Sequence, residues 1–196
     1  MLMLSIATNA QSVADKIATS FKGELKLSMP APITDETPVI YVMDEEGNPK
    51  IDENGQPIKE VFTVTITKQS DNSVQFRLPN FGFMGMNLGD IVLDNRPVVA
   101  DEANKRTLFG ENDPVNLSFM GGLILATAKI NPATSYILDS GEAFVDVDVV
   151  WTNTGGDPMP IYVRFTGKSY VTTGIAIVQS KAAQAQAFDL QGRPAN

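Results

Sequence analysis

Apolar and polar residues alternate with a period of two along most of the chain. In TVTITKQSDNSVQFRL, residues 63–78, Val64 and Ile66 alternate with threonines, and Val74 and Phe76 alternate with polar residues after a polar turn. Alternation of this kind places one face of a strand against a core and the other face in water. Two such runs on either side of a polar turn predict a β-hairpin.

Further strands are expected wherever the same period recurs. No amphipathic segment is long enough for a βαβ crossover, and only residues 11–20, with Val13 and Ile17 four apart, predict a helical turn or two. Gly82, Gly85 and Gly89 interrupt an apolar run and indicate the bends that a closing sheet needs. The pattern therefore predicts an all-β fold, an antiparallel up-and-down barrel of eight strands. The other expected strands are 21–29, 39–43, 107–109, 115–119, 123–130, 142–151, 161–167 and 174–178.

The domain organisation follows from where the alternation begins and ends. Residues 21–180 are assigned to the barrel, 11–20 to a lead-in segment and 181–196 to a loose polar tail. The first ten residues, MLMLSIATNA, are typical of the end of a secretory signal peptide, since Thr8 and Ala10 are small enough for a cleavage site. We interpret residues 1–10 as the remnant of a signal peptide. This interpretation predicts an exported protein, in the periplasm, on the outer-membrane surface or outside the cell. A short buried N-terminal segment is the alternative.

A small repeat lies between the first two long strands. DEEGNP (44–49) and DENGQP (52–57) each place a glycine where a left-handed turn requires positive φ. The carboxylates suggest calcium, but the glycine is the fourth residue from Asp52, where an EF-hand loop has its glycine at the sixth. Solvated turns in an exposed acidic arm are therefore expected, and no metal site.

Composition excludes several classes of function. The 196-residue chain has a net charge of −8 and no cluster of Lys and Arg, which argues against nucleic-acid binding. It contains no His and no Cys, so it can build neither a Ser-His-Asp triad nor a Cys/His zinc site. Asp146 and Asp148 share one strand face, where they could act as paired carboxylates or form a solvated outer face, and we expect the latter. No enzyme activity, cofactor or transmembrane segment is predicted.

Bulky apolar side chains are the candidate binding residues. A wall rich in Met and Phe adapts to ligands of irregular shape, although the same residues could fill the core of the barrel. An eight-stranded barrel is at the size where side chains either plug the interior or leave room for one small ligand. The candidate ligand-binding residues are Phe81, Phe83, Met84, Met86, Phe119, Met120, Trp151 and Met159.

Three stretches carry a resemblance to a known family. FKGELKL (21–27), VTITKQSDNSVQFRLPNFGFMGMNLGDIVL (64–93) and MPIYVRFTG (159–167) resemble the calycin-like, lipocalin-type β-barrel domains of secreted bacterial proteins over roughly residues 20–170. The chain departs from true lipocalins, which have Gly-x-Trp on the first strand, because Gly23 is followed here by Glu24 and Leu25. AFDLQGR (187–193) looks like the start of a C-terminal sorting module. The resemblance implies a barrel, export and a small apolar ligand, and it implies no catalytic residues.

Two functions are consistent with these observations. The first is a non-catalytic exported barrel that binds a small hydrophobic or amphipathic ligand in its interior or mouth. The second is a plugged structural module of the cell envelope whose acidic arm and loops bind a protein or glycan partner.

Overall fold

The computed structural model describes residues 11–83 and 86–170, apart from the side chains of residues 83–87. The proposed signal remnant, the strand expected at 174–178 and the polar tail lie outside the described residues. The elements, in chain order, are α1 (Val13–Ile17), β1 (Ser20–Ser28), β2 (Phe62–Ser70), β3 (Ser73–Phe83), β4 (Met86–Asp101), η1 (Glu102–Asn104), β5 (Arg106–Phe109), β6 (Val115–Phe119), η2 (Met120–Gly122), β7 (Ile124–Ile130), β8 (Tyr136–Leu138), β9 (Glu142–Trp151) and β10 (Met159–Tyr170).

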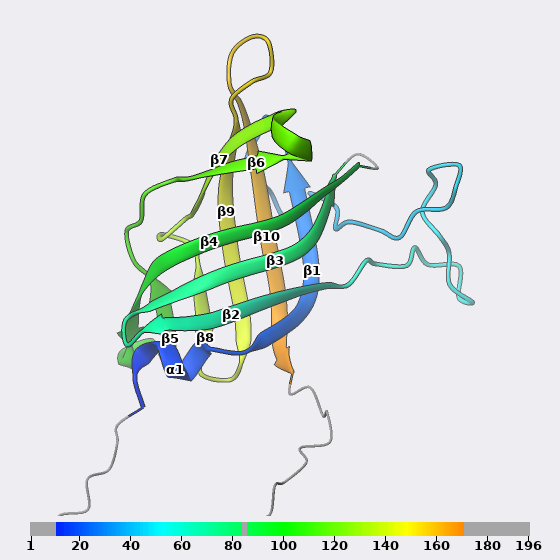
Figure 1. Cartoon of the computed structure of the whole chain (residues 1–196). Coiled ribbons are helices and arrows are strands. Elements are labelled where there is room, and N and C mark those ends of the chain that lie inside the picture. Colours follow the sequence, from blue (N-terminus) through cyan, green and yellow to red (C-terminus); the bar gives the residue numbers. More distant parts are fainter. Residues whose placement is uncertain (1–10, 84–85, 171–196) are drawn as a thin grey trace, which may run out of the picture.

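Eight of the strands form a closed antiparallel ring (Figure 1). Its order is β10-β1-β2-β3-β4-β5-β8-β9, and β9 pairs back onto β10 from Met159↔Trp151 to Lys168↔Glu142. The prediction of an all-β antiparallel barrel is confirmed. The β6–β7 hairpin departs from the simple up-and-down order. β8 pairs with β9 only at Ala143 and Phe144, and β7 pairs with the rest of the same edge, from Val147 to Trp151, so the hairpin forms part of the barrel wall at that end.

The ring closes where two glycines face each other. Gly23 of β1 lies opposite Gly167 of β10. A Cβ atom on Gly23 would lie 2.0 Å from the carbonyl oxygen of Thr166, and one on Gly167 would lie 2.5 Å from the ring of Phe165. Real Cβ atoms do not tolerate such contacts, so β1 and β10 can approach this closely only without side chains at these two positions.

The helix α1 closes one end of the barrel. Ser12 and Asp15 form a capping box, and Ala14 and Ile17 are buried in the main apolar core. The Asp15 carboxylate pairs with the Lys68 ammonium of β2 at 2.8 Å, and this bond, with a second from Ser12, lowers the pKa of Asp15 to about 2. The helical turn expected between residues 11 and 20 is confirmed, and it plugs the base of the ring.

Three register shifts between β3 and β4 change which residues point inward. In β3, Phe76 and Leu78 are buried, but Asn80 adopts a positive φ of 52° and the next buried residue is Phe81. In β4, a bulge with Asn95 at φ 55° separates buried Leu93 from Arg96 and Val98. A third register shift falls at the glycines, between the pairs Phe81↔Gly89 and Gly82↔Asn87, and Gly89 has a φ of 101°. A bend expected from the glycine-rich stretch is therefore present there, while Gly85 lies outside the described residues.

The connection between β1 and β2 projects from the barrel as an arm (Figure 1). Its two turns have positive φ at Gly47 and Gly55, as predicted. Val42, Lys50 and Ile58, spaced eight residues apart, form a closed triangle of backbone hydrogen bonds of 2.8–2.9 Å, each N–H donating to the carbonyl of another. The prediction of a strand at 39–43 is wrong, because only isolated bridges form there.

Replacing either closing glycine by alanine should destabilise the barrel. We expect Gly23→Ala and Gly167→Ala each to lower the free energy of unfolding by about 3 kcal/mol, since a methyl group cannot fit between the two strands. Gly156→Ala is the control, because nothing lies within 4 Å of the position that its Cβ atom would take, and it should change stability by less than about 0.5 kcal/mol. Equal stability of all three variants in urea titrations would contradict this view of ring closure.

Candidate functional site

The candidate site is an apolar cavity inside the end of the barrel opposite α1. Its volume is about 80 Å³, several times the space that one water molecule needs. The lining side chains come from seven strands, which places the cavity on the axis of the ring. They are Leu27, Phe81, Leu88, Ile91, Leu117, Phe119, Ile124, Ala126, Val149, Trp151, Ile161 and Val163.

The bulge in β3 brings Phe81 into this cavity. Without the additional residue, the alternation that buries Phe76 and Leu78 would turn Phe81 to the outside. Asp90 stabilises the bulge, since its carboxylate accepts the backbone N–H of Asn80 at 3.0 Å and also bonds Arg77. The bond from Asn80 and then the bond from Arg77 lower the pKa of Asp90, so the bulge is held by a charged acceptor.

One wall of the cavity lacks a hydrogen-bonded ladder. Among the described residues, β4 pairs with β5 only from Val98 to Asp101, and β6 pairs only with β7. Leu88 and Ile91 of β4 therefore meet Leu117 and Phe119 of β6 through side chains that line the same space. In the described residues this wall is formed by apolar side chains of β4 and β6, with no strand pairing between these two strands.

A buried arginine holds the base of this unpaired wall. The Arg96 guanidinium donates to the Asn112 side chain at 2.9 Å and to the carbonyl of Asp113 at 2.8 Å. The Asn112 amide in turn bonds both the N–H and the carbonyl of Ile130 in β7. These bonds connect β4 to the two ends of the β6–β7 hairpin, just before β6 and at the last residue of β7. Burial lowers the pKa of Arg96 below its ordinary value.

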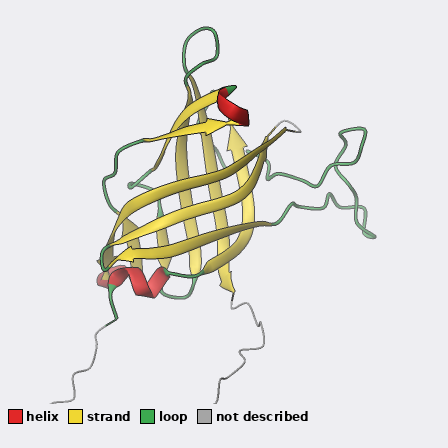
Figure 2. Ribbon diagram, in the orientation of Figure 1, coloured by secondary structure: helices red, strands yellow, loops and turns green. Residues whose placement is uncertain are grey.

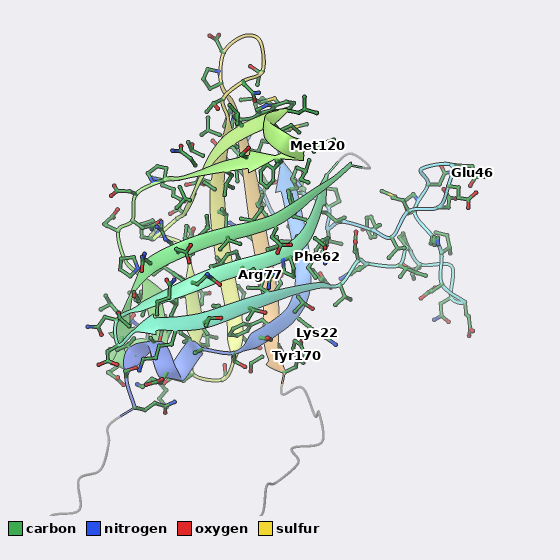
Figure 3. All side chains as sticks on the ribbon, viewed as in Figure 1. Lys22, Glu46, Phe62, Arg77, Met120 and Tyr170 are labelled. Atoms are coloured by element: carbon green, nitrogen blue, oxygen red, sulfur yellow. The ribbon has the colours of Figure 1, made fainter. Side chains whose placement is uncertain are left out.

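The sequence-derived candidates divide into three groups. Phe81, Phe119 and Trp151 line the cavity. Met159 is half-buried in β10 without lining it, and Met120 is exposed on η2 (Figure 3). The side chains of Phe83, Met84 and Met86 lie outside the described residues.

Sequence reasoning missed most of the aliphatic lining. Leu117 belongs to the alternating run of β6, so its inward orientation was readable. Leu88 and Ile91 lie three residues apart on β4, and both line the cavity because the register shifts at Gly89. Ile124 stands between two leucines, so alternation did not give its direction. Their place at one end of the barrel depends on strand register, which the pattern does not give.

The paired carboxylates on β9 have structural partners. Asp146 forms a two-bond ion pair with Arg164, at 2.7 and 2.9 Å, and this pairing raises the pKa of Arg164. Asp148 accepts a hydrogen bond from Asn131 at 3.2 Å. Both carboxylates are therefore engaged with neighbouring side chains on the outer surface of the ring.

Two further features of the described segments bear on function. Within residues 11–83 and 86–170, no three His, Cys, Asp or Glu residues are grouped so that they could hold a metal ion. No helix in these two segments has the length and apolar character needed to cross a membrane.

Comparison with known proteins identifies the barrel. The family model of the calycin-like beta-barrel domain matches residues 46–168. The chain belongs to this family. The match begins in the arm and ends in β10, so the closing strand β1 of this calycin-like domain lies before the matched region. Neither the curated proteins nor the solved structures provide a match.

Proposed function

We propose that this calycin-like domain binds the apolar part of a small hydrophobic or amphipathic ligand and catalyses no reaction. The supporting observation is the cavity itself, an open space on the barrel axis surrounded by twelve apolar residues. Space of this kind is unusual in a protein interior, because close packing leaves few voids larger than a water molecule.

The size and chemistry of the cavity narrow the ligand class. At about 80 Å³ it is smaller than the roughly 300–1,000 Å³ of a typical ligand pocket, so it accepts only a short hydrocarbon portion. The indole N–H of Trp151 already donates to Asn153 at 2.9 Å, so the lining offers no free donor to a polar group. A longer ligand would therefore keep its polar head at the rim, beside the unpaired β4–β6 wall.

Filling the cavity should weaken ligand binding without harming the fold. Ala126 lines the cavity, and Thr127, the next residue of β7, points to the outer surface. We expect Ala126→Leu to weaken binding of straight-chain alcohols and fatty acids at least tenfold, because the added carbons occupy the space, and Thr127→Leu to leave it unchanged. Isothermal titration calorimetry with a series of chain lengths measures both.

Stability measurements at two alanine positions on β7 distinguish a cavity from a filled core. Ala126→Leu should change the free energy of unfolding by less than about 1 kcal/mol, whereas Ala128→Leu, buried outside the cavity lining, should cost about 1–3 kcal/mol. Failure of the wild-type protein to bind any member of the series would reject the proposed function. Undiminished binding by Ala126→Leu would place the ligand elsewhere.

A second candidate function uses the projecting arm. Met43, Ile51 and Ile58 are exposed there, and Figure 3 shows Glu46 at the far end of the arm from the barrel. Exposed apolar residues beside carboxylates suit a protein partner with a basic, partly apolar surface. Met43→Ser with Ile51→Ser should remove such a partner from cell-envelope pull-downs without lowering the melting temperature. Retention of the same proteins by this variant would exclude the arm.

We also propose that the protein is exported. The support is the sequence MLMLSIATNA, in which Thr8 and Ala10 have the small side chains of a cleavage site. N-terminal sequencing of protein recovered from the periplasmic or extracellular fraction should then begin at Gln11. Recovery of the protein in the cytoplasmic fraction, beginning at Met1, would contradict export.

A further inference from the structure

The tip of the β6–β7 hairpin exposes three large apolar side chains. Leu123 is 70% exposed, Met120 is 47% exposed and Leu125 is 42% exposed. The tip lies at the end of the barrel opposite α1 (Figure 2), and Figure 3 shows Met120 there. The adjacent residues Phe119 and Ile124 line the cavity, so the hairpin presents apolar groups both inward and outward.

Specific contacts hold this exposed tip in one shape. The Asn153 side chain donates to the carbonyl of Leu123 at 3.0 Å and accepts the N–H of Leu125 at 2.7 Å. Its oxygen also accepts the Trp151 indole N–H. Met120 adopts a positive φ of 51°, which is costly for a residue with a side chain. The apolar residues are thus displayed on a fixed turn.

Charge is absent from this hairpin. Residues 114–128 contain no Asp, Glu, Lys or Arg, although the chain as a whole carries a net charge of −8. At the other end of the barrel, Lys16–Glu102, Lys68–Asp15 and Lys168–Glu142 are ion pairs. The end near α1 therefore carries several ion pairs, and the hairpin tip at the opposite end is neutral and apolar. The β9–β10 loop, which carries Asp157, projects at the same end as the tip (Figure 1).

We propose that the Met120–Leu125 tip docks on a neutral lipid surface, a zwitterionic bilayer. Three partly exposed side chains provide far less than the roughly 800 Å² that each partner of a stable protein interface contributes. Shallow insertion of apolar side chains into a bilayer needs no such area and suits a tip without charge. The net charge of −8 disfavours an anionic surface.

Docking and cavity binding use different faces of the same hairpin. The outward residues Leu123 and Leu125 would contact lipid, and the inward residues Phe119 and Ile124 would contact a ligand. Docking therefore goes beyond the proposed function, and either activity can fail without the other. In a docked molecule the cavity would lie next to the acyl chains.

Vesicle flotation tests this proposal with the full chain. Wild-type protein should float with phosphatidylcholine vesicles, and less with vesicles that also contain phosphatidylglycerol. Leu123→Ser with Leu125→Ser should weaken binding about tenfold or more, since it removes two apolar groups from the contact. Leu123→Trp should strengthen binding, because Trp favours the membrane interface. Val99→Ser, at a 55% exposed apolar position on β4 outside the tip, should change nothing.

Several results would overturn the proposal. They are no flotation of the wild-type protein, flotation only with phosphatidylglycerol, and equal flotation of the serine variants at the tip and at Val99. A dimer in sedimentation analysis that the tip variant dissociates would show instead that a second copy covers the tip. Thermal unfolding establishes that each variant is folded. If the double serine variant does not fold, the flotation of Leu123→Trp tests the proposal alone, and flotation no stronger than that of the wild-type protein would overturn it.

Discussion

The ladder between β1 and β10 is the contact on which the rest of the molecule depends. A twisted antiparallel sheet becomes a barrel only when its first and last strands meet, and here they meet with Gly23 opposite Gly167. The buried ring of Phe165 covers the space beside Gly167 that a side chain would otherwise occupy. Closure gives every strand a common inner face, so the period-two pattern becomes a single apolar interior.

The two ends of this interior are built differently. At one end, β5 and β8 complete the ring, and α1 adds Ala14 and Ile17 to the buried core. At the other end, the β6–β7 hairpin covers the opening without pairing to β4 in the described structure. The β7–β9 ladder and side-chain bonds from Arg96, Asn112 and Asn153 hold the hairpin in place. The cavity lies where packing between β4 and β6, and not a hydrogen-bonded ladder, forms one wall.

The strands could be predicted from the sequence because each shows its own alternation of apolar and polar residues, whereas the pairing of distant strands could not. The alternation of β6 and β9 predicted their bounds, 115–119 and 142–151, because inward and outward environments differ at every step. The position of the β6–β7 hairpin was not predictable, since it depends on the pairing of β7 with β9, which alternation does not specify. Ser12 and Asp15 form a capping box that a reading of residues 11–20 could have found.

The site was less predictable than the fold for a related reason. Phe81 and Phe119 were chosen as bulky apolar residues, and they line the cavity because a bulge and a register place them there. Met120 follows Phe119 directly but lies on a turn that exposes it. A cavity is a small difference between the space that a ring encloses and the volume of its side chains. Composition alone does not determine that difference.

Crystals pressurised with xenon test the central claim most directly, because xenon enters apolar cavities that remain dry. A closed ring with open space at the β6–β7 end predicts a xenon atom in contact with Ile91, Phe119 and Val149, with no ordered water at that position. An interior without xenon, or one in which ordered water or repacked side chains occupy this space, would contradict the account.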